Sequence, residues 1–320
     1  MRSRRSADVP TLVAHAREGS ARAVARLITL VENADPSLRE VMAALAPHSG
    51  HARIIGLTGS PGVGKSTTTS MLVGALRAEG KRVGVLAVDP TSPFSGGALL
   101  GDRIRLVEHS LDREVYMRSM ASRGHLGGLS WSTPQALRVL DAAGCDVVIV
   151  ETVGVGQSEV EVAGLADTTV VLLAPGMGDG IQAAKAGILE VGDVFVVNKA
   201  DRDGADITVR EIRQMISLGD RTESGLWRPP VIKAIAERGE GAGDLMEGLN
   251  NHLAWMTEHG VLHQRRIDRA SREIEAIALR QVRARMGEVR HGRSLDDLAA
   301  EVVAGQQDPY AAADRVIAAL

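Results

Sequence analysis

Aromatic side chains are scarce in this chain, at 2% of its 320 residues. A core with so few rings must be built from aliphatic side chains. A surface with so few rings also offers no platform on which nucleic-acid bases could stack. The formal net charge of −3 argues in the same direction, because general nucleic-acid binders carry excess positive charge for the phosphates. We therefore expect no nucleic acid among the partners.

Cysteine and long hydrophobic runs are nearly missing as well. Cys145 is the single cysteine, which excludes an internal disulfide and a cysteine-cluster metal site. It precedes the apolar residues 147–150, so we expect a buried structural thiol. No stretch approaches the roughly eighteen consecutive apolar residues of a membrane-spanning helix, and the basic residues 1–5 are not followed by the apolar segment of a secretory signal. These absences predict a cytoplasmic protein with no membrane contact.

Short apolar runs alternate with helical patterns through the middle of the chain. Continuous apolar strands separated by helices are typical of a parallel sheet with helices on both faces. The sequence therefore predicts an α/β fold with a mostly parallel sheet, in which ligands bind at the carboxyl ends of the strands. The predicted strands are residues 53–58, 82–88, 146–151, 168–174, 194–198 and 230–234.

Both ends of the chain have helical patterns without strands. Residues 8–46 repeat apolar positions near helical spacing, with Ser20 as the N-cap of the second segment. After about residue 256 no strand is predicted, and residues 264–286, 294–303 and 309–320 are predicted helices. A helical arm with no sheet of its own must bury its apolar positions on the sheet domain or on another copy. We expect three regions: an N-terminal helical region (1–50), a central α/β domain (51–256) and a C-terminal helical arm (257–320).

A phosphate-binding loop follows the first predicted strand and precedes a predicted helix over 65–79. Residues 59–66 fit the pattern G-x-x-x-x-G-K-[ST]. The glycines let backbone N–H groups surround a phosphate, Lys65 can reach the β- and γ-phosphates, and the Ser66 hydroxyl can ligate Mg²⁺. The strand–loop–helix context favours this function over an ordinary glycine-rich turn. The predicted α/β fold is therefore that of a P-loop NTPase. The predicted phosphate-contacting residues are Gly59, Ser60, Pro61, Gly62, Val63, Gly64, Lys65, Ser66 and Thr67.

A second motif predicts which nucleotide binds. Asn198, Lys199 and Asp201 follow an apolar strand about 130 residues after the phosphate loop. A carboxylate such as Asp201 can accept hydrogen bonds from the ring N–H and the amino group of guanine. Adenine presents an acceptor there and would be rejected. We therefore expect GTP as substrate and GDP as product, with Ala236 and Glu237 in the loop that closes over the base.

Carboxylates end two other predicted strands. Asp89 and Glu151 occupy places where a carboxylate commonly holds the Mg²⁺ shell or positions water. Turn or cap residues are the alternative, because acidic side chains often end strands. Asp102 could approach the metal, and the N–H of Gly154 could reach the γ-phosphate. Three arginines are candidate cations for transition-state charge, although a structural role is favoured for any one of them: Arg103, Arg118 and Arg123.

Taken together, the motifs resemble the MeaB/ArgK family, the G-protein chaperones of methylmalonyl-CoA mutase and related cobalamin-dependent mutases, within the SIMIBI class of P-loop GTPases. The likeness spans essentially the whole chain and is carried by residues 56–67, 88–90, 101–105, 151–159 and 198–201. A glutamate at 151, where many GTPases have aspartate, is this family's pattern. The resemblance implies that five residues cluster around Mg²⁺ and the phosphates: Lys65, Ser66, Asp89, Asp102 and Glu151. All but Ser66 are the predicted catalytic residues, and all but Lys65 are the predicted metal ligands.

The resemblance implies two further features. Residues 174–185 match an extra switch that couples the nucleotide state to the mutase, with Asp179 and Lys185 as its charged residues. The residues alone indicate only a glycine-rich strand-to-helix turn there. The family also implies that residues 51–256 form a P-loop GTPase domain. It implies a homodimer formed through the C-terminal helices, so that residues 257–320 would be a dimerisation arm.

The predicted function is a Mg²⁺-dependent GTPase that gates cofactor loading or protection of a cobalamin-dependent acyl-CoA mutase of the methylmalonyl-CoA mutase type. No side chain is an evident strong base, although Gln157 or Glu159 could orient water. We therefore expect slow turnover alone and faster turnover with the partner. One alternative is a phosphotransferase (kinase) of a periplasmic arginine/ornithine transport system. A metal-delivery GTPase for nickel enzymes would need a Cys/His ligand set that one cysteine and nine scattered histidines do not supply. A scaffold that binds GTP without using hydrolysis is a further alternative.

Overall fold

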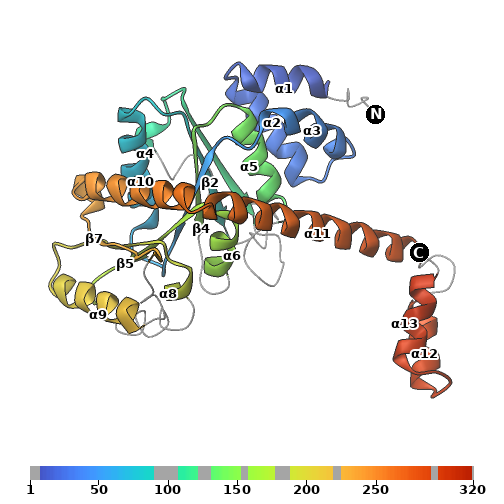
Figure 1. Ribbon diagram of the computed structural model, residues 1–320. Helices are drawn as coiled ribbons and strands as arrows, with labels where there is room; N and C mark the ends of the chain where they lie inside the picture. The colour runs from blue at the N-terminus through green and yellow to red at the C-terminus, as the bar shows by residue number, and fades with distance from the viewer. Residues whose placement is uncertain are drawn as a thin grey trace. The chain divides into compact units, whose positions relative to one another are not determined.

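The computed structural model describes residues 8–89, 107–121, 131–152, 158–176, 188–218, 225–289 and 295–318. Within these ranges, seven strands form one parallel sheet in the order β3-β2-β4-β1-β5-β6-β7 (Figure 1). The strands are β1 (Arg53–Thr58), β2 (Val83–Asp89), β3 (Val115–Ala121), β4 (Val147–Thr152), β5 (Thr168–Leu173), β6 (Val194–Val197) and β7 (Val231–Lys233). The chain divides into two compact units, Met1–Arg265 and Arg266–Leu320.

The predicted α/β architecture is confirmed, and each of the six predicted strands is present. Sequence reasoning missed β3, which lies at one edge of the sheet beside β2. Its sequence interrupts the apolar pattern with Arg118 and Ser119, and several of its side chains are only half-buried. An edge strand needs fewer apolar side chains than a central one, so its pattern is weaker.

Helices cover both faces of the sheet (Figure 1). On one face, apolar side chains of the sheet pack with an N-terminal group of helices and two later ones. These are α1 (Val9–Arg17), α2 (Ala21–Glu32), α3 (Leu38–Leu45), α5 (Thr133–Ala142) and α6 (Ser158–Leu165). Helix α9 (Ala205–Leu218) covers β5 and β6. The opposite face packs against α4 (Lys65–Ala78) and α10 (Ala242–Glu258). The short helical segments are η1 (Ala46–His48), η3 (Val107–His109), α8 (Ile188–Val191) and η4 (Ala236–Arg238).

Two local expectations are met in the first unit. The Ser20 hydroxyl accepts a hydrogen bond from the backbone N–H of Ala23 at 3.3 Å, so it caps α2 as predicted. Cys145 is buried, with 3% of its surface exposed. Burial raises the pKa of its thiol well above the usual range, which makes it a structural rather than a reactive thiol.

The second unit consists of helices joined by turns in the residues that the structure describes. Helix α11 (Val261–Val289) begins in the first unit and supplies much of the second, followed by α12 (Leu295–Val303) and α13 (Pro309–Ala318). The guanidinium of Arg315 on α13 donates to Glu301 on α12 at 2.6 Å. None of the helices described for this chain has the length and apolar composition needed to cross a bilayer.

Candidate nucleotide site

The phosphate loop joins the carboxyl end of β1 to the start of α4, and its shape depends on two glycines. Gly59 has φ +141°, and a Cβ there would lie 2.3 Å from the carbonyl oxygen of Leu172 on β5. Gly64 has φ +94°, and a Cβ there would lie 2.3 Å from the side-chain nitrogen of Asn198. A larger residue at either position would clash with a neighbouring strand or its following segment. The two glycines therefore let the loop pack closely against β5 and against the segment that follows β6.

Lys65 is the first residue of α4 and lies within the loop that it follows. It is only 8% exposed, and its ammonium donates to the carbonyl oxygens of Gly59 at 2.5 Å and Ser60 at 3.0 Å. The positive side chain and the N-terminus of a helix thus lie at the same place. Both favour an anion, so the loop has the electrostatics of a phosphate site.

Glu151, near the end of β4, brings a carboxylate to the same helix. The side chain is 1% exposed. Its Oε1 accepts a hydrogen bond from the Ser66 hydroxyl at 2.5 Å, and its Oε2 accepts one from the Thr69 hydroxyl at 3.0 Å. Carboxylate and hydroxyl oxygens are the ligands that Mg²⁺ prefers. The predicted pair Ser66 and Glu151 therefore fits this cation.

Thr69 was missed by sequence reasoning. The available signal was its spacing, because it follows Ser66 by three residues and so lies on the same face of α4. Its hydroxyl holds the second oxygen of Glu151 and is fully buried. Thr69 can therefore fix the orientation of that carboxylate.

The predicted base-recognition segment lies directly against the phosphate loop. The Asn198 side chain donates to the carbonyl of Val63 at 2.9 Å and accepts from the N–H of Ala236 at 3.0 Å. Lys199, with φ +56°, donates to the carbonyl of Gly62 at 2.6 Å. Three segments far apart in the sequence thus meet at the carboxyl edge of the sheet.

Asp201 lies at the exposed rim of this cluster. Its side chain is 41% exposed and lies 3.8 Å from the guanidinium of Arg238, a residue that sequence reasoning missed. Arg238 is also 3.9 Å from Glu240. Glu237, predicted to line the base, is exposed in this structure. Of the predicted phosphate-contacting residues, Pro61, Gly62 and Thr67 are exposed too.

Other predicted site residues fall at or beyond the limits of the described chain. Asp89 ends β2 and pairs in register with Ala121, but its side chain is not described. Asp102, Gly154, Asp179 and Lys185 lie outside the described residues, as do Arg103, Arg123 and Gln157; Glu159 lies in α6, but its side chain is not described.

Arg118 is described and has a structural contact. Its guanidinium donates to Glu32 on α2 at 2.6 Å and so links β3 to the N-terminal helices. The structural role that the sequence favoured for any one of the three arginines therefore applies to Arg118.

The phosphate loop, the buried glutamate beside its serine and the adjacent Asn-Lys-x-Asp segment define a P-loop GTPase. The family model for the methylmalonyl-CoA mutase-associated GTPase MeaB matches residues 24–290. The chain therefore belongs to this family.

Individual relatives agree with that assignment. A Pyrococcus horikoshii protein named as a GTPase is 46% identical over 314 residues, which cover 97% of each chain. The mouse methylmalonic aciduria type A homolog, a mitochondrial protein, is 39% identical over 216 residues, which cover 66% of this chain and 52% of the mouse protein. Among solved structures, a LAO/AO transport system kinase superimposes with a TM-score of 0.68 at 25% identity, over 97% of both chains.

Proposed function

We propose that this GTPase is a Mg²⁺-dependent chaperone that gates cofactor loading or protection of a cobalamin-dependent acyl-CoA mutase of the methylmalonyl-CoA mutase type. The match of the mutase-associated family model to residues 24–290 carries this proposal. The similarity to the mouse methylmalonic aciduria type A homolog supports it. The geometry of the nucleotide site supports the GTP-hydrolysing activity of the proposed chaperone.

The residues of the site act by binding and positioning. Lys65 and the backbone N–H groups of the loop hold the phosphates and stabilise the charge that develops on the γ-phosphoryl group. Ser66 and Glu151 would hold Mg²⁺, which when bound neutralises charge on the β- and γ-phosphate oxygens. Thr69 fixes Glu151 through its hydroxyl. Asp201 selects guanine at the exposed rim of the nucleotide site. Its carboxylate can accept hydrogen bonds from the N–H groups of the base.

We expect slow GTP hydrolysis by the chain alone because of the hydrogen bonds that Glu151 accepts. This buried carboxylate accepts hydrogen bonds from two hydroxyls on α4, which suits a metal ligand better than a proton acceptor for water. Hydrolysis then depends on positioning that a partner protein can improve. Asp102, Asp179 and Lys185 remain proposed contributors to the metal site and the switch.

The test combines kinetics with partner capture. We expect slow GTP hydrolysis by the purified chain and at least a tenfold increase when a methylmalonyl-CoA mutase-type enzyme is added. A pull-down from the native cell with a non-hydrolysable GTP analogue should retain a cobalamin enzyme that the GDP-loaded chain retains less well. Rapid hydrolysis by the chain alone, together with no effect of the mutase, would contradict the proposal.

A kinase of a transport system is the alternative function, because the chain superimposes on a LAO/AO transport system kinase. GTP labelled at the γ-phosphate separates the two functions. Label recovered only as free phosphate supports the GTPase chaperone. Label transferred to a transport protein supports the phosphotransferase.

We further propose that the chain forms a homodimer through its C-terminal helices. Along α11, Ile267, Ile274 and Ile277 are exposed, and their intervals of seven and three residues place them on one side of the helix. An apolar stripe of this kind is stabilised when a second copy covers it.

A further inference from the structure

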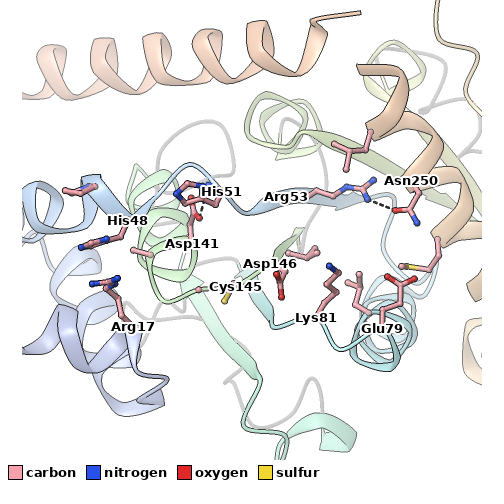
Figure 2. A pocket seen from close by; sticks show the side chains of 17 residues that line it. Arg17, His48, His51, Arg53, Glu79, Lys81, Asp141, Cys145, Asp146 and Asn250 are labelled. Atoms are coloured by element: carbon pink, nitrogen blue, oxygen red, sulfur yellow. Dashed lines mark hydrogen bonds between the residues drawn. The ribbon is translucent and has the colours of Figure 1, made fainter. Parts of the chain in front are cut away.

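Charged side chains balance one another in the cavity at the amino ends of the strands. This cavity, of about 650 Å³, is lined by residues at the starts of β1 and β4 and at the end of α4 (Figure 2). The arginine, lysine, aspartate and glutamate residues in its described lining are Arg17, Arg53, Glu79, Lys81, Asp141 and Asp146. With three charges of each sign, this lining favours neither a cation nor an anion. The carboxyl edge of the sheet differs, because there one exposed arginine lies near two carboxylates.

Arg238 is that arginine, and it lies at the base-recognition rim of the nucleotide site. One terminal nitrogen of its guanidinium, Nη2, is 3.8 Å from Oδ2 of Asp201, and the other, Nη1, is 3.9 Å from Oε1 of Glu240. The three side chains are 61%, 41% and 58% exposed, in that order. Both distances exceed that of a hydrogen bond. The guanidinium is therefore shared between two carboxylates and is fixed to neither.

The backbone around Arg238 is held in place at this rim. The N–H of Arg238 donates to the carbonyl of Ile235 at 2.9 Å, and Ile235 forms an antiparallel bridge with Glu240. The N–H of Ala236 donates to the side chain of Asn198 at 3.0 Å, which ties η4 to the Asn-Lys-x-Asp segment. Only the side chain of Arg238 therefore has to move between its two partners.

A guanidinium and the edge of guanine offer a carboxylate the same donors. The N1–H group, C2 and the exocyclic amino group of guanine form a guanidine fragment, whose N–H groups are the donors proposed to bind Asp201. The guanidinium of an arginine presents parallel N–H donors to a carboxylate in the same manner. An arginine beside Asp201 is therefore a chemical competitor of the base for this carboxylate.

We propose that Arg238 competes with guanine for Asp201 and so limits the affinity of the site for GDP and GTP. When the base binds, Arg238 leaves Asp201 and pairs with Glu240, which keeps its charge compensated. When the base leaves, Arg238 returns and supplies donors to Asp201. This competition rests on the proposed selection of guanine by Asp201 and adds a residue that opposes it. Because exposed ion pairs are weak, the competition should change nucleotide affinity by a small factor and favour release of GDP.

Two single substitutions should shift GDP affinity in opposite directions. Arg238→Gln removes the competitor and should raise the affinity about threefold, whereas Glu240→Gln removes the alternative partner and should lower it about twofold. Long-range attraction of an anionic nucleotide would give the reverse, because losing a positive charge weakens that attraction and losing a negative charge strengthens it. Competition against a fluorescent GTP analogue measures both variants, in the full chain with Mg²⁺.

Arg202→Gln is the matched control, since it removes the same charge from an exposed position next to Asp201 and should not raise the affinity. The double variant Arg238→Gln with Glu240→Gln should match Arg238→Gln alone, because Glu240 acts only through Arg238. Raising NaCl from about 0.1 M to about 1 M shortens the screening length from about 10 Å to about 3 Å and should shrink the gain in Arg238→Gln. All these positions are exposed, so the variants should fold, which circular dichroism verifies.

An unchanged or lower GDP affinity in Arg238→Gln, or an unchanged or higher one in Glu240→Gln, would overturn the proposal. Combined with Asp201→Asn, Arg238→Gln should no longer raise the affinity, because the carboxylate for which it competes is gone. A gain that persists there would also refute the competition. Loss of GTP affinity in Asp201→Asn together with either of these results refutes the competition alone, whereas intact GTP affinity in Asp201→Asn refutes guanine selection itself.

Discussion

At the scale of single residues, the side chains and backbone of the nucleotide site pack so closely that few substitutions fit. Gly59 and Gly64 leave no room for a Cβ beside β5 and Asn198. Lys65 lies inside the loop, and Glu151 is held by two hydroxyls. The motif residues were evident in the sequence because each belongs to a local pattern. Thr69 was not, because its partner lies 82 positions away in the chain.

Thr69→Val tests whether this hydroxyl positions Glu151. Valine has nearly the same shape but cannot donate to Oε2, and a hydrogen bond to a charged group contributes about 1.5–3 kcal/mol. We expect about a tenfold higher Mg²⁺ concentration for half-maximal GTPase activity, with little change in GDP affinity measured without Mg²⁺. Thr257→Val removes an exposed hydroxyl of α10 that donates to the carbonyl of Leu253 in the same helix at 2.8 Å, and it should change neither quantity. An unaltered Mg²⁺ dependence in Thr69→Val would exclude the positioning role.

Asp201→Asn tests base selection. An amide cannot accept hydrogen bonds from both N–H donors of guanine, so GTP affinity should fall at least a hundredfold, as expected for a site that selects its substrate by hydrogen bonds. Xanthosine triphosphate presents a carbonyl at the position of the amino group, so its affinity should rise. The measurement is competition against a fluorescent GTP analogue. Asp203→Asn, at an exposed neighbouring position, is the control, and equal behaviour of the two variants would contradict the assignment.

At the scale of elements, an ion pair anchors the start of α11 to the sheet. Arg265 donates to both carboxylate oxygens of Asp193 at 2.9 Å and to the carbonyl of Asp167 at 3.0 Å. Burial lowers the pKa of Arg265, but the hydrogen bonds to Asp193 together with the charges of Asp193 and Asp167 outweigh burial, and the pKa is raised. Trp227 donates to the carbonyl of Asp193 at 2.7 Å, and the buried His252 lies 3.4 Å from its carboxylate.

Arg265→Met should therefore destabilise the first unit. The substitution keeps most of the apolar stem but leaves the buried Asp193 without its charged partner, at a cost of about 2 kcal/mol. Urea unfolding followed by tryptophan fluorescence measures this, because Trp227 and Trp255 lie in the same cluster. Arg283→Met, at an exposed position farther along α11, should change stability by less than about 0.5 kcal/mol. Equal midpoints for the two variants would show that the ion pair is not an anchor.

At the scale of the whole molecule, the chain combines a nucleotide-binding unit with a helical unit whose apolar surface is exposed. The side chain of Ile274 on α11 is 68% exposed. Isolated exposed apolar side chains are ordinary, whereas a row of them along one helix marks a surface that another chain can cover.

Ile274→Asp tests the proposed homodimer. A carboxylate at the centre of the apolar stripe would have to be desolvated in a dimer, so we expect at least a tenfold weaker dimer, measured by light scattering during gel filtration. GTP binding should be unchanged, because the nucleotide site lies in the other unit. Ile207→Asp makes the same exchange at an exposed position of α9 and should leave the dimer intact. A wild-type chain that is monomeric throughout the micromolar range would contradict the proposal.

The sequence by itself determined the parallel α/β fold, the phosphate loop and the Asn-Lys-x-Asp segment that follows β6. These depend on short-range patterns: apolar runs, glycine spacing and residues that directly follow a strand. Tertiary structure alone decided that Thr69 holds Glu151, that Arg118 pairs with Glu32 and that β3 closes one edge of the sheet. It also decided that Arg238 lies beside Asp201. Such features join residues far apart in the chain, and no local pattern encodes which distant side chain will lie within hydrogen-bonding distance.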